Sequence, residues 1–437
     1  MKKSIIFVLV LLPILAFSQM QHIISQGNTT TIQRILGGSN TIDSSLIKIR
    51  NIDKTDLLVS MPDSSFIQTV FAHSTMGTNA TTLLTFPHLK IYDFKIFAGN
   101  IYFCGQDSSS GVGFISWMSI SNLLSANPVA FTVQKITNPI KPKAVTDLEV
   151  YKWEDSIHVV ALADSRYLID MNTSNPSTYQ IMRQNISQPF KKLSVGKDKI
   201  ITLGKDSDTS LVITAFDKGN ISQYMYRGFT HPELRYNKYV LENSMTNEDI
   251  FTFGYTHREY TSNNYYKTDF ATFEVTNWIH IINKQYLEIP DGKLEPIDLE
   301  FCQEDSTLLY LAGGNYGHDE IFPIKHLVHN DYVINTIQPN DTIQYPIKQY
   351  NSIIRYDNYY FAAFAKDTPS SRGLIFDCKR DVSSFLNCAS SNTGNVINTF
   401  FLGYTSLNAN YTYMLGQQDT IVLKHSYISN SYTIQCQ

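Results

Sequence analysis

Hydrophobic and polar residues alternate along many short stretches of this chain, and convincing amphipathic helices are hard to find. A period of two residues is typical of a half-buried β-strand, because successive side chains point to opposite faces of a sheet. Clusters of Asn, Asp, Gly and Ser separate these stretches at the spacing expected of an all-β fold. The pattern therefore predicts a chain built almost entirely of short strands and turns.

One arrangement of strands returns along the chain: a strand, a turn, and then a strongly apolar strand that ends in a small residue. Two clear copies are NIYFCGQD at 100–107 and IHVVALADS at 157–165. A third strand follows nearly every copy, and a fourth, more polar strand closes most of the units. The small residues that mark the seven copies are Gly105, Ala163, Gly204, Gly254, Gly313, Ala365 and Gly416.

These seven markers recur with a mean spacing of about 52 residues, close to the period of about 40–50 residues found in β-propeller blades. One blade cannot bury both of its faces alone, so consecutive blades stack around a central channel. In this repeat pattern most of the chain resembles the β-propeller superfamily, as in a secreted bacterial propeller. It has no WD, kelch, YWTD or Asp-box motif, so the resemblance implies a fold and no particular family.

We therefore predict an all-β fold, a β-propeller with seven or eight four-stranded blades. Residues 91–437 would hold the propeller repeats, and residues 19–90 would form either an extra blade or a cover over the ring. Two tandem β-sandwiches would also give many short strands, but they would not repeat one strand order in every unit. A right-handed β-helix would need a shorter period.

Residues 1–18 have the pattern of a secretory signal peptide. Two lysines open the segment, residues 4–17 are almost continuously apolar, and the small residues Ala16 and Ser18 precede Gln19. The apolar run is shorter than the roughly 20 residues of a membrane-spanning helix, which favours cleavage over an uncleaved anchor. Because no later segment reads as a membrane span, we expect a secreted or periplasmic protein, with the cell surface as a further location.

Composition and charge narrow the class of protein. Hydrophobic residues make up 43% of the chain and charged residues only 17%, whereas disorder requires low hydrophobicity and high net charge. The formal net charge is −4, which argues against a basic surface that binds nucleic acid. The 27 Tyr and 25 Phe residues suit half-buried sheets, in which aromatic side chains are favoured.

The five cysteines include no CxxC pair, and the closely paired ligands of a zinc site are absent. Export would permit disulfides. Cys378 and Cys388 flank a predicted hairpin turn, CKRDVSSFLNC, and could face each other across adjacent strands. The alternative is that all five thiols are buried and pack as small hydrophobic groups.

Two connections between second and third strands differ from the others in length and composition. The connection after 249–256 and the connection after 307–315 belong to consecutive units, so in a propeller they would project from one face side by side. Tyrosine faces beside polar groups suit the binding of a sugar ring or a peptide; the alternative is that the tyrosines pack on one another and order a long hairpin. The candidate ligand-binding residues are Tyr260, Tyr265, Tyr266, Tyr316 and His318.

The second of these connections also raises the question of a metal site. His318, Asp319, Glu320, His326 and His329 lie close together in the sequence. The segment around 321–329 reads as a strand, in which residues three apart point to opposite faces, so His326 and His329 would not converge on one ion. We therefore predict no metal site and no cofactor.

Carboxylates in the innermost strands provide the enzymatic alternative. Asp147 and Glu149, like Asp298 and Glu300, are two residues apart, so each pair shares one face of its strand and could line the channel. There they could act as paired acids in a glycan-active hydrolase or lyase, or they could simply be the polar lining of a water-filled channel. No GxSxG motif or thiol nucleophile arrangement is present. The sequence favours a non-catalytic binding module with a glycan or protein ligand.

Overall fold

The computed structural model describes β-sheet structure from residue 20 to residue 429, and side chains are described at positions between 48 and 299. The described residues are 20–22, 31–37, 48–52, 56–62, 67–75, 80–125, 129–137, 140–176, 178–183, 190–207, 210–230, 234–245, 248–258, 266–288, 294–302, 307–314, 319–325, 333–334, 336–339, 347–356, 359–366, 371–379, 389–392, 410–415, 417–422 and 424–429.

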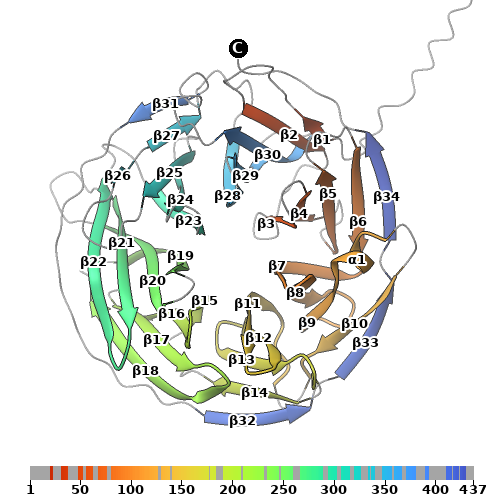
Figure 1. Ribbon diagram of the computed structural model, residues 1–437, viewed down its shortest axis with the longest axis horizontal. Coiled ribbons are helices and arrows are strands. Elements are labelled where there is room, and N and C mark those ends of the chain that lie inside the picture. The colour runs from red at the N-terminus through yellow and green to blue at the C-terminus, as the bar shows by residue number, and fades with distance from the viewer. Residues whose placement is uncertain are drawn as a thin grey trace, which may run out of the picture.

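Within these residues the chain forms seven antiparallel sheets that stand radially around a central axis (Figure 1). The first strand of each sheet lies nearest the axis. These innermost strands are β3 (Lys48–Asn51), β7 (Leu89–Phe97), β11 (Val145–Trp153), β15 (Phe190–Val195), β19 (Leu234–Met245), β23 (Leu294–Cys302) and β28 (Ile347–Tyr356).

Each sheet continues outward through consecutive hairpins. The second strands are β4 (Asp56–Pro62), β8 (Asn100–Asp107), β12 (Ser156–Ala163), β16 (Lys199–Ser207), β20 (Ile250–Arg258), β24 (Thr307–Gly314) and β29 (Tyr359–Lys366). The third strands are β5 (Thr69–Thr75), β9 (Val112–Ser119), β13 (Tyr167–Asn172), β17 (Ser210–Asp217), β21 (Tyr266–Val275), β25 (Asp319–Lys325) and β30 (Ser371–Lys379).

Fourth strands complete the sheets, and one of them comes from the N-terminal part of the chain. Beside the third strands lie β6 (Ala80–Phe86), β10 (Ala130–Lys135), β14 (Thr178–Arg183), β18 (Asn220–Thr230), β22 (Ile279–Glu288), β27 (Thr336–Pro339) and, beside β30, β2 (Thr31–Gly37). The short strand β26 (Val333–Ile334) pairs with β25, and the single-turn helix α1 (Ile120–Leu123) connects β9 to β10.

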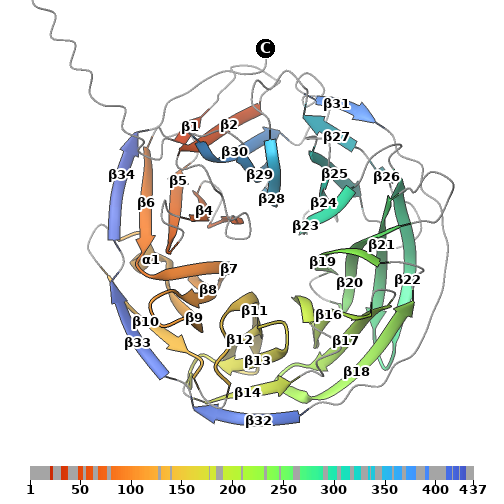
Figure 2. The same ribbon diagram turned by 180° about the vertical axis from the view of Figure 1, so that it is seen from behind.

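Several sheets carry a fifth strand on the outside of the ring (Figure 2). From the C-terminal part of the chain, β32 pairs with β14, β33 with β10 and β34 with β6. The fifth strands are β1 (Met20–His22), β31 (Ala389–Asn392), β32 (Asn410–Leu415), β33 (Gln417–Val422) and β34 (Lys424–Ser429). The prediction of an all-β propeller with four-stranded antiparallel units is thus confirmed.

The repeat pattern matches the strands in six of its seven copies. The markers from Gly105 to Ala365 all lie in second strands, from β8 to β29. The seventh copy differs, because β32 and β33 on either side of position 416 pair with two other sheets and form no unit of their own. In the N-terminal part of the chain, β3 to β6 form a four-stranded sheet that β34 extends.

The small marker residue has a steric cause. In β7 the pairing with β8 shifts between Ile91 and Asp93, and a Cβ atom on Gly105 would lie only 1.8 Å from the carbonyl oxygen of Lys90. Corresponding shifts occur at the start of β11, β15 and β23. A bulge inserts one extra residue and re-aims the side chains that follow it. Here the residue after the bulge, such as Asp93, lines the central channel.

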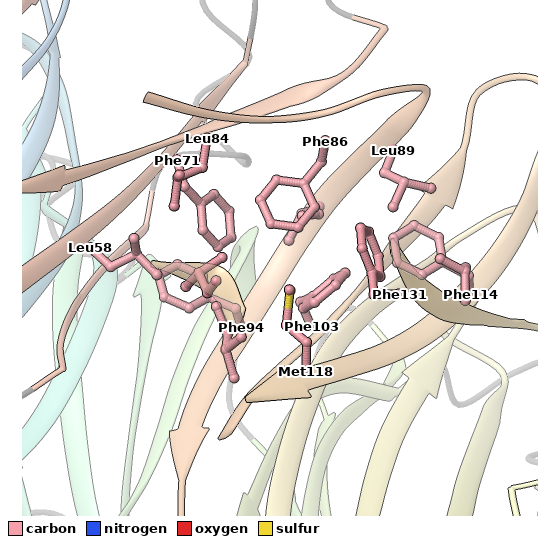
Figure 3. Close-up of a cluster of buried hydrophobic side chains, with 14 residues drawn as sticks. Leu58, Phe71, Leu84, Phe86, Leu89, Phe94, Phe103, Phe114, Met118 and Phe131 are labelled. Atoms are coloured by element: carbon pink, nitrogen blue, oxygen red, sulfur yellow. The ribbon is translucent and has the colours of Figure 1, made fainter. Parts of the chain in front are cut away.

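The core lies between neighbouring sheets. Between the sheet that starts with β3 and the sheet that starts with β7, phenylalanines from both sides interlock (Figure 3). The ring centroids of Phe71 and Phe94 are 4.8 Å apart, and those of Phe86 and Phe103 are 5.2 Å apart. Such apolar contacts hold consecutive sheets face to face, so the innermost strands are fixed around the axis.

Candidate functional site: the charged central channel

The innermost strands bring a dense set of charged side chains together in the channel. Residues from six strands surround a space of about 30 Å³, which is enough for one or two water molecules. The charged members are Lys48 and Arg50 of β3, Asp93 and Lys95 of β7, Asp147 and Glu149 of β11, Lys192 of β15, Glu242 of β19, and Asp298 of β23.

Strand alternation explains why charges gather here. Residues two apart on one strand share a face, and this places the pair Asp93 and Lys95, like the pair Asp147 and Glu149, toward the axis. The bulge before Asp93 and the equivalent bulge before Asp147 set the phase of this alternation. The channel lining therefore follows from the backbone geometry of the repeat and the choice of two residues in each innermost strand.

Charges of opposite sign are paired across neighbouring strands. The Lys95 ammonium lies 2.6 Å from a carboxylate oxygen of Glu149, and both side chains are largely buried. Burial alone would lower the pKa of Lys95, but the Glu149 carboxylate outweighs it and raises that pKa above its ordinary value. Lys95 therefore stays charged, and the ion pair links β7 to β11.

Asp93 and Asp147 form a second kind of contact, between two acids. Their carboxyl groups lie within hydrogen-bond reach of each other, so the charge of one affects the pKa of the other. Each also accepts a backbone N–H from the next innermost strand: Leu148 N donates to Asp93 Oδ2 at 3.2 Å, and Leu193 N donates to Asp147 Oδ2 at 3.0 Å. The two aspartates thus connect three consecutive sheets.

The two acids have opposite pKa shifts. Burial raises the pKa of Asp147 to about 7, and the neighbouring Asp93 carboxylate adds to the rise against the opposing effect of Lys192. For Asp93 burial acts in the same direction, but Lys48 and Lys95 outweigh it, and the pKa lies below its ordinary value. Asp93 is therefore the ionised member of the pair near neutral pH.

The remaining lysines respond to the same cluster. Burial lowers the pKa of Lys48, and the charge of Lys192 lowers it further. Burial would also lower the pKa of Lys192, but Asp147 and Asp93 raise it above the ordinary value. Among the described residues of the lining, five carboxyl groups face four cations, so the two signs nearly balance there.

This geometry limits what the channel can do. Among the described side chains, the space of about 30 Å³ is too small for a sugar ring or a peptide, and charged groups around it, such as Lys95 and Glu149, are engaged with one another. Matched charges with hydrogen bonds between sheets are suited to holding the sheets in register. In the described part of the chain, no group of three or more His, Cys, Asp or Glu residues is arranged to hold a metal ion.

The sequence predicted part of this site. It identified Asp147, Glu149 and Asp298 as channel-lining, and the structure brings them together; the side chain of Glu300 lies outside the described residues. It missed Asp93 and the cations that face it. Their signal was present as polar residues at alternate positions of otherwise apolar innermost strands, such as DFK at 93–95.

The predicted tyrosine site falls largely outside the described residues. Tyr260, Tyr265, Tyr316 and His318 lie in undescribed connections, and Tyr266 opens β21 with its side chain undescribed. Arg258 pairs with Tyr266, so these two residues close the β20–β21 hairpin. The strands that flank both connections belong to adjacent sheets, because β19 contacts β23.

The predicted disulfide also stays a prediction. Cys378 lies in β30, where its backbone pairs with Tyr360 of β29 on one side and Thr31 of β2 on the other. Cys388 lies outside the described residues. Cys104 is a free thiol that is fully buried beside the channel, and burial raises its pKa well above the ordinary value. That thiol is consistent with a packing role.

No protein-family model matches the sequence, and no curated protein matches it. Among solved structures, the WD40 domain of SCAP from fission yeast is similar at 9% identity and a TM-score of 0.38, over 85% of this chain and 98% of that one. The extracellular domains 1–2 of Drosophila Semaphorin 1a are similar at 8% identity and a TM-score of 0.39, over 77% of this chain and 88% of that one. The strand pairing and the radial ring of sheets define the chain as a β-propeller protein.

No helix in the described residues has the length and apolar character required to cross a membrane.

Proposed function

We propose that this protein is an exported β-propeller that acts as a non-catalytic binding module for a glycan or protein ligand. The observation that carries the proposal is the charged lining of the described part of the channel, where the side chains of six innermost strands enclose a space of about 30 Å³ and Lys95 is paired with Glu149. We therefore expect a ligand of either class to contact the rim of the ring or its outer surface. Export rests on residues 1–18, and recovery of mature protein that begins at Gln19 would support it.

We propose further that the ring has seven blades. Seven sheets are present among the described residues, and β28 of the last sheet contacts β3 of the first, which supports a closed ring. Pairing of β2 with β30 joins the N-terminal part of the chain to the last blade. A closed ring protects its blades from splaying, because every sheet packs against a neighbour on both faces.

For the binding surface we propose the connections after β20 and β24, with Tyr260, Tyr265, Tyr266, Tyr316 and His318. Support comes from the strands that flank them: both connections join a second to a third strand, and their sheets are adjacent. Such connections leave a propeller on one face. Aromatic side chains with polar tips provide large contact area at a low entropic cost.

Replacing Tyr265 and Tyr266 with Ala tests this surface. On the magnitudes of interface hot spots, we expect binding to weaken by about 2–4 kcal/mol, measured on a glycan array and against a pool of extracellular proteins. Tyr167→Ala is the matched control, because Tyr167 opens the third strand β13 as Tyr266 opens β21. Full binding by the double variant would refute this surface, and a collapsed melting temperature in that variant alone would show that the tyrosines are structural.

The alternative is a glycan-active hydrolase or lyase that uses channel carboxylates. Glycosidases hold their two carboxyl groups about 5 Å or more apart, with the sugar between them. Of the acids on which this alternative depends, Glu149 is paired with Lys95 at 2.6 Å, and Asp147 lies within hydrogen-bond reach of Asp93, so both are engaged by neighbouring side chains. If the wild-type protein cleaves a glycan and Asp147→Asn does not, the result favours the alternative. If Asp147→Asn binds the ligand as the wild type does, the result supports a binding surface on the rim.

A further inference from the structure

We infer that Asp93 and Asp147 share one proton, so that the channel contains a proton-binding site. When the proton leaves, the contact between three consecutive sheets weakens. The inference concerns the channel alone and does not depend on the proposed ligand-binding surface.

The hydrogen-bond pattern of the two carboxyl groups favours a shared proton. Asp93 Oδ2 and Asp147 Oδ2 each accept a backbone N–H. The other oxygen, Asp93 Oδ1, is buried and receives no donor from the described groups unless the Asp147 carboxyl carries a proton. Two ionised carboxylates have only acceptors and repel each other, whereas one protonated member can donate to the other.

The surroundings place the proton on Asp147. Asp93 is only 3% exposed and lies close to the cations Lys48 and Lys95, which stabilise its ionised form. The groups that face the pair are Lys48 and Arg50 of β3, Lys95 of β7, Cys104 of β8, Glu149 of β11, Lys192 of β15, Glu242 of β19 and Asp298 of β23. A proton on Asp147 removes one negative charge from the described lining, in which carboxyl groups outnumber cations by one.

The proton has a definite effect on stability. The pKa of Asp147 is about 7 in the folded protein and near its ordinary value of 3.8 in the unfolded chain, so the folded state binds this proton more tightly. The stabilisation is therefore complete below about pH 4, falls as the pH rises toward 7, and is lost above that pH. Loss of the proton leaves two like charges in contact between β7 and β11.

Asp147→Asn provides the test, because its side-chain amide can donate to Asp93 permanently and can accept from Leu193 N. We expect the wild-type unfolding constant, relative to that of the variant, to rise by up to about tenfold per pH unit between pH 5 and 7, with no further change above pH 8. Denaturant unfolding across this range measures it. Asp164→Asn is the control: Asp164 also accepts two backbone N–H groups, at 2.9 and 3.0 Å, but lies outside the channel lining.

A direct measurement covers the case in which Asp147→Asn does not fold. Infrared spectra of protein with labelled aspartate should show a protonated carboxyl that titrates with a midpoint near pH 7 and is missing from Asp147→Asn. In Asp93→Asn, the new amide can donate to Asp147, so this midpoint should move down. Absence of a protonated carboxyl at pH 5–6, or identical pH profiles for wild type and Asp147→Asn, would overturn the inference.

Discussion

β14 and β18 are both fourth strands, but their outer edges differ. Residues Thr178–Arg183 of β14 pair along their whole length with β32, and β10 and β6 are covered in the same way by β33 and β34. In the described part of the chain, no strand pairs with the outer edge of β18 or β22. We call the sheets that end in β6, β10 and β14 the covered sheets, and the sheets that end in β18 and β22 the open-edged sheets.

The inner halves of the two groups are built alike. The pairing shift at the start of the innermost strand occurs in β11 of a covered sheet and in β15 of an open-edged sheet. Aromatic clusters fill the space between neighbours in both groups. At the open edges, the Arg227 guanidinium of β18 donates to the carbonyl of Ile279 at the start of β22 and so ties one edge to the next.

This difference shows that the repeat specifies the inner blade, while a segment outside the repeat finishes the covered edges. An exposed strand edge offers unpaired N–H and C=O groups to other chains. One C-terminal segment removes this hazard for three sheets at once.

The largest expected effect comes from deleting residues 410–437. The deletion exposes the edges of β6, β10 and β14 and removes 18 ladder pairings, six from each strand. We expect the covered sheets to lose about 5 kcal/mol or more of stability, comparable to the total stability of many domains. Hydrogen exchange by mass spectrometry should show lost protection in β6, β10 and β14 with β18 and β22 unchanged. An equal loss of protection in all five strands would mean that the covered and open-edged sheets unfold together.

A second comparison concerns the cores. Phe103 lies fully buried in the cluster between two covered sheets, and Phe251 lies fully buried in the cluster between the two open-edged sheets. Replacing either with Ala should cost about 3–5 kcal/mol, because each leaves a cavity in a packed interface. Urea unfolding measures both, with the corresponding Leu variants as smaller deletions. If the losses of stability in Phe103→Ala and Phe251→Ala differ by more than about 2 kcal/mol, the covering of an outer edge also affects the packing of the core.

The smallest expected effect concerns the bulge, which the two groups share. Gly105→Ala places a methyl group against the carbonyl of Lys90. Gly204 pairs with Phe190 beside the equivalent pairing shift of an open-edged sheet, so Gly204→Ala is the matching variant there. Each should cost about 1–3 kcal/mol through overpacking. Ala163→Gly is the control, since this second strand already accommodates a methyl group, and it should cost about 0.5–1 kcal/mol. If Gly204→Ala leaves the stability unchanged while Gly105→Ala lowers it, the need for a small residue at the bulge is confined to the covered sheets.

Particular residues show how far sequence reasoning reached. The marker Gly105 was recognisable from its repeat, and the channel position of Asp147 and Glu149 followed from alternation along one strand. Asp93 was missed because its role depends on β11 of the next sheet, whose Leu148 N–H it accepts. The local pattern predicts Gly416 as a seventh marker, but the strands on either side of it pair with two other sheets.

The sequence by itself determined the strands, their order within a unit and the small residue in the second strand, because alternation and steric contact act over a few residues or across one hairpin. Only the tertiary structure decided which sheet each C-terminal strand joins; Ser429 pairs with Ala80, and nothing local specifies that partner. It also decided the state of the channel acids. The pKa of Asp147 depends on burial and on charges from other sheets, and these exist only once the ring brings the innermost strands together.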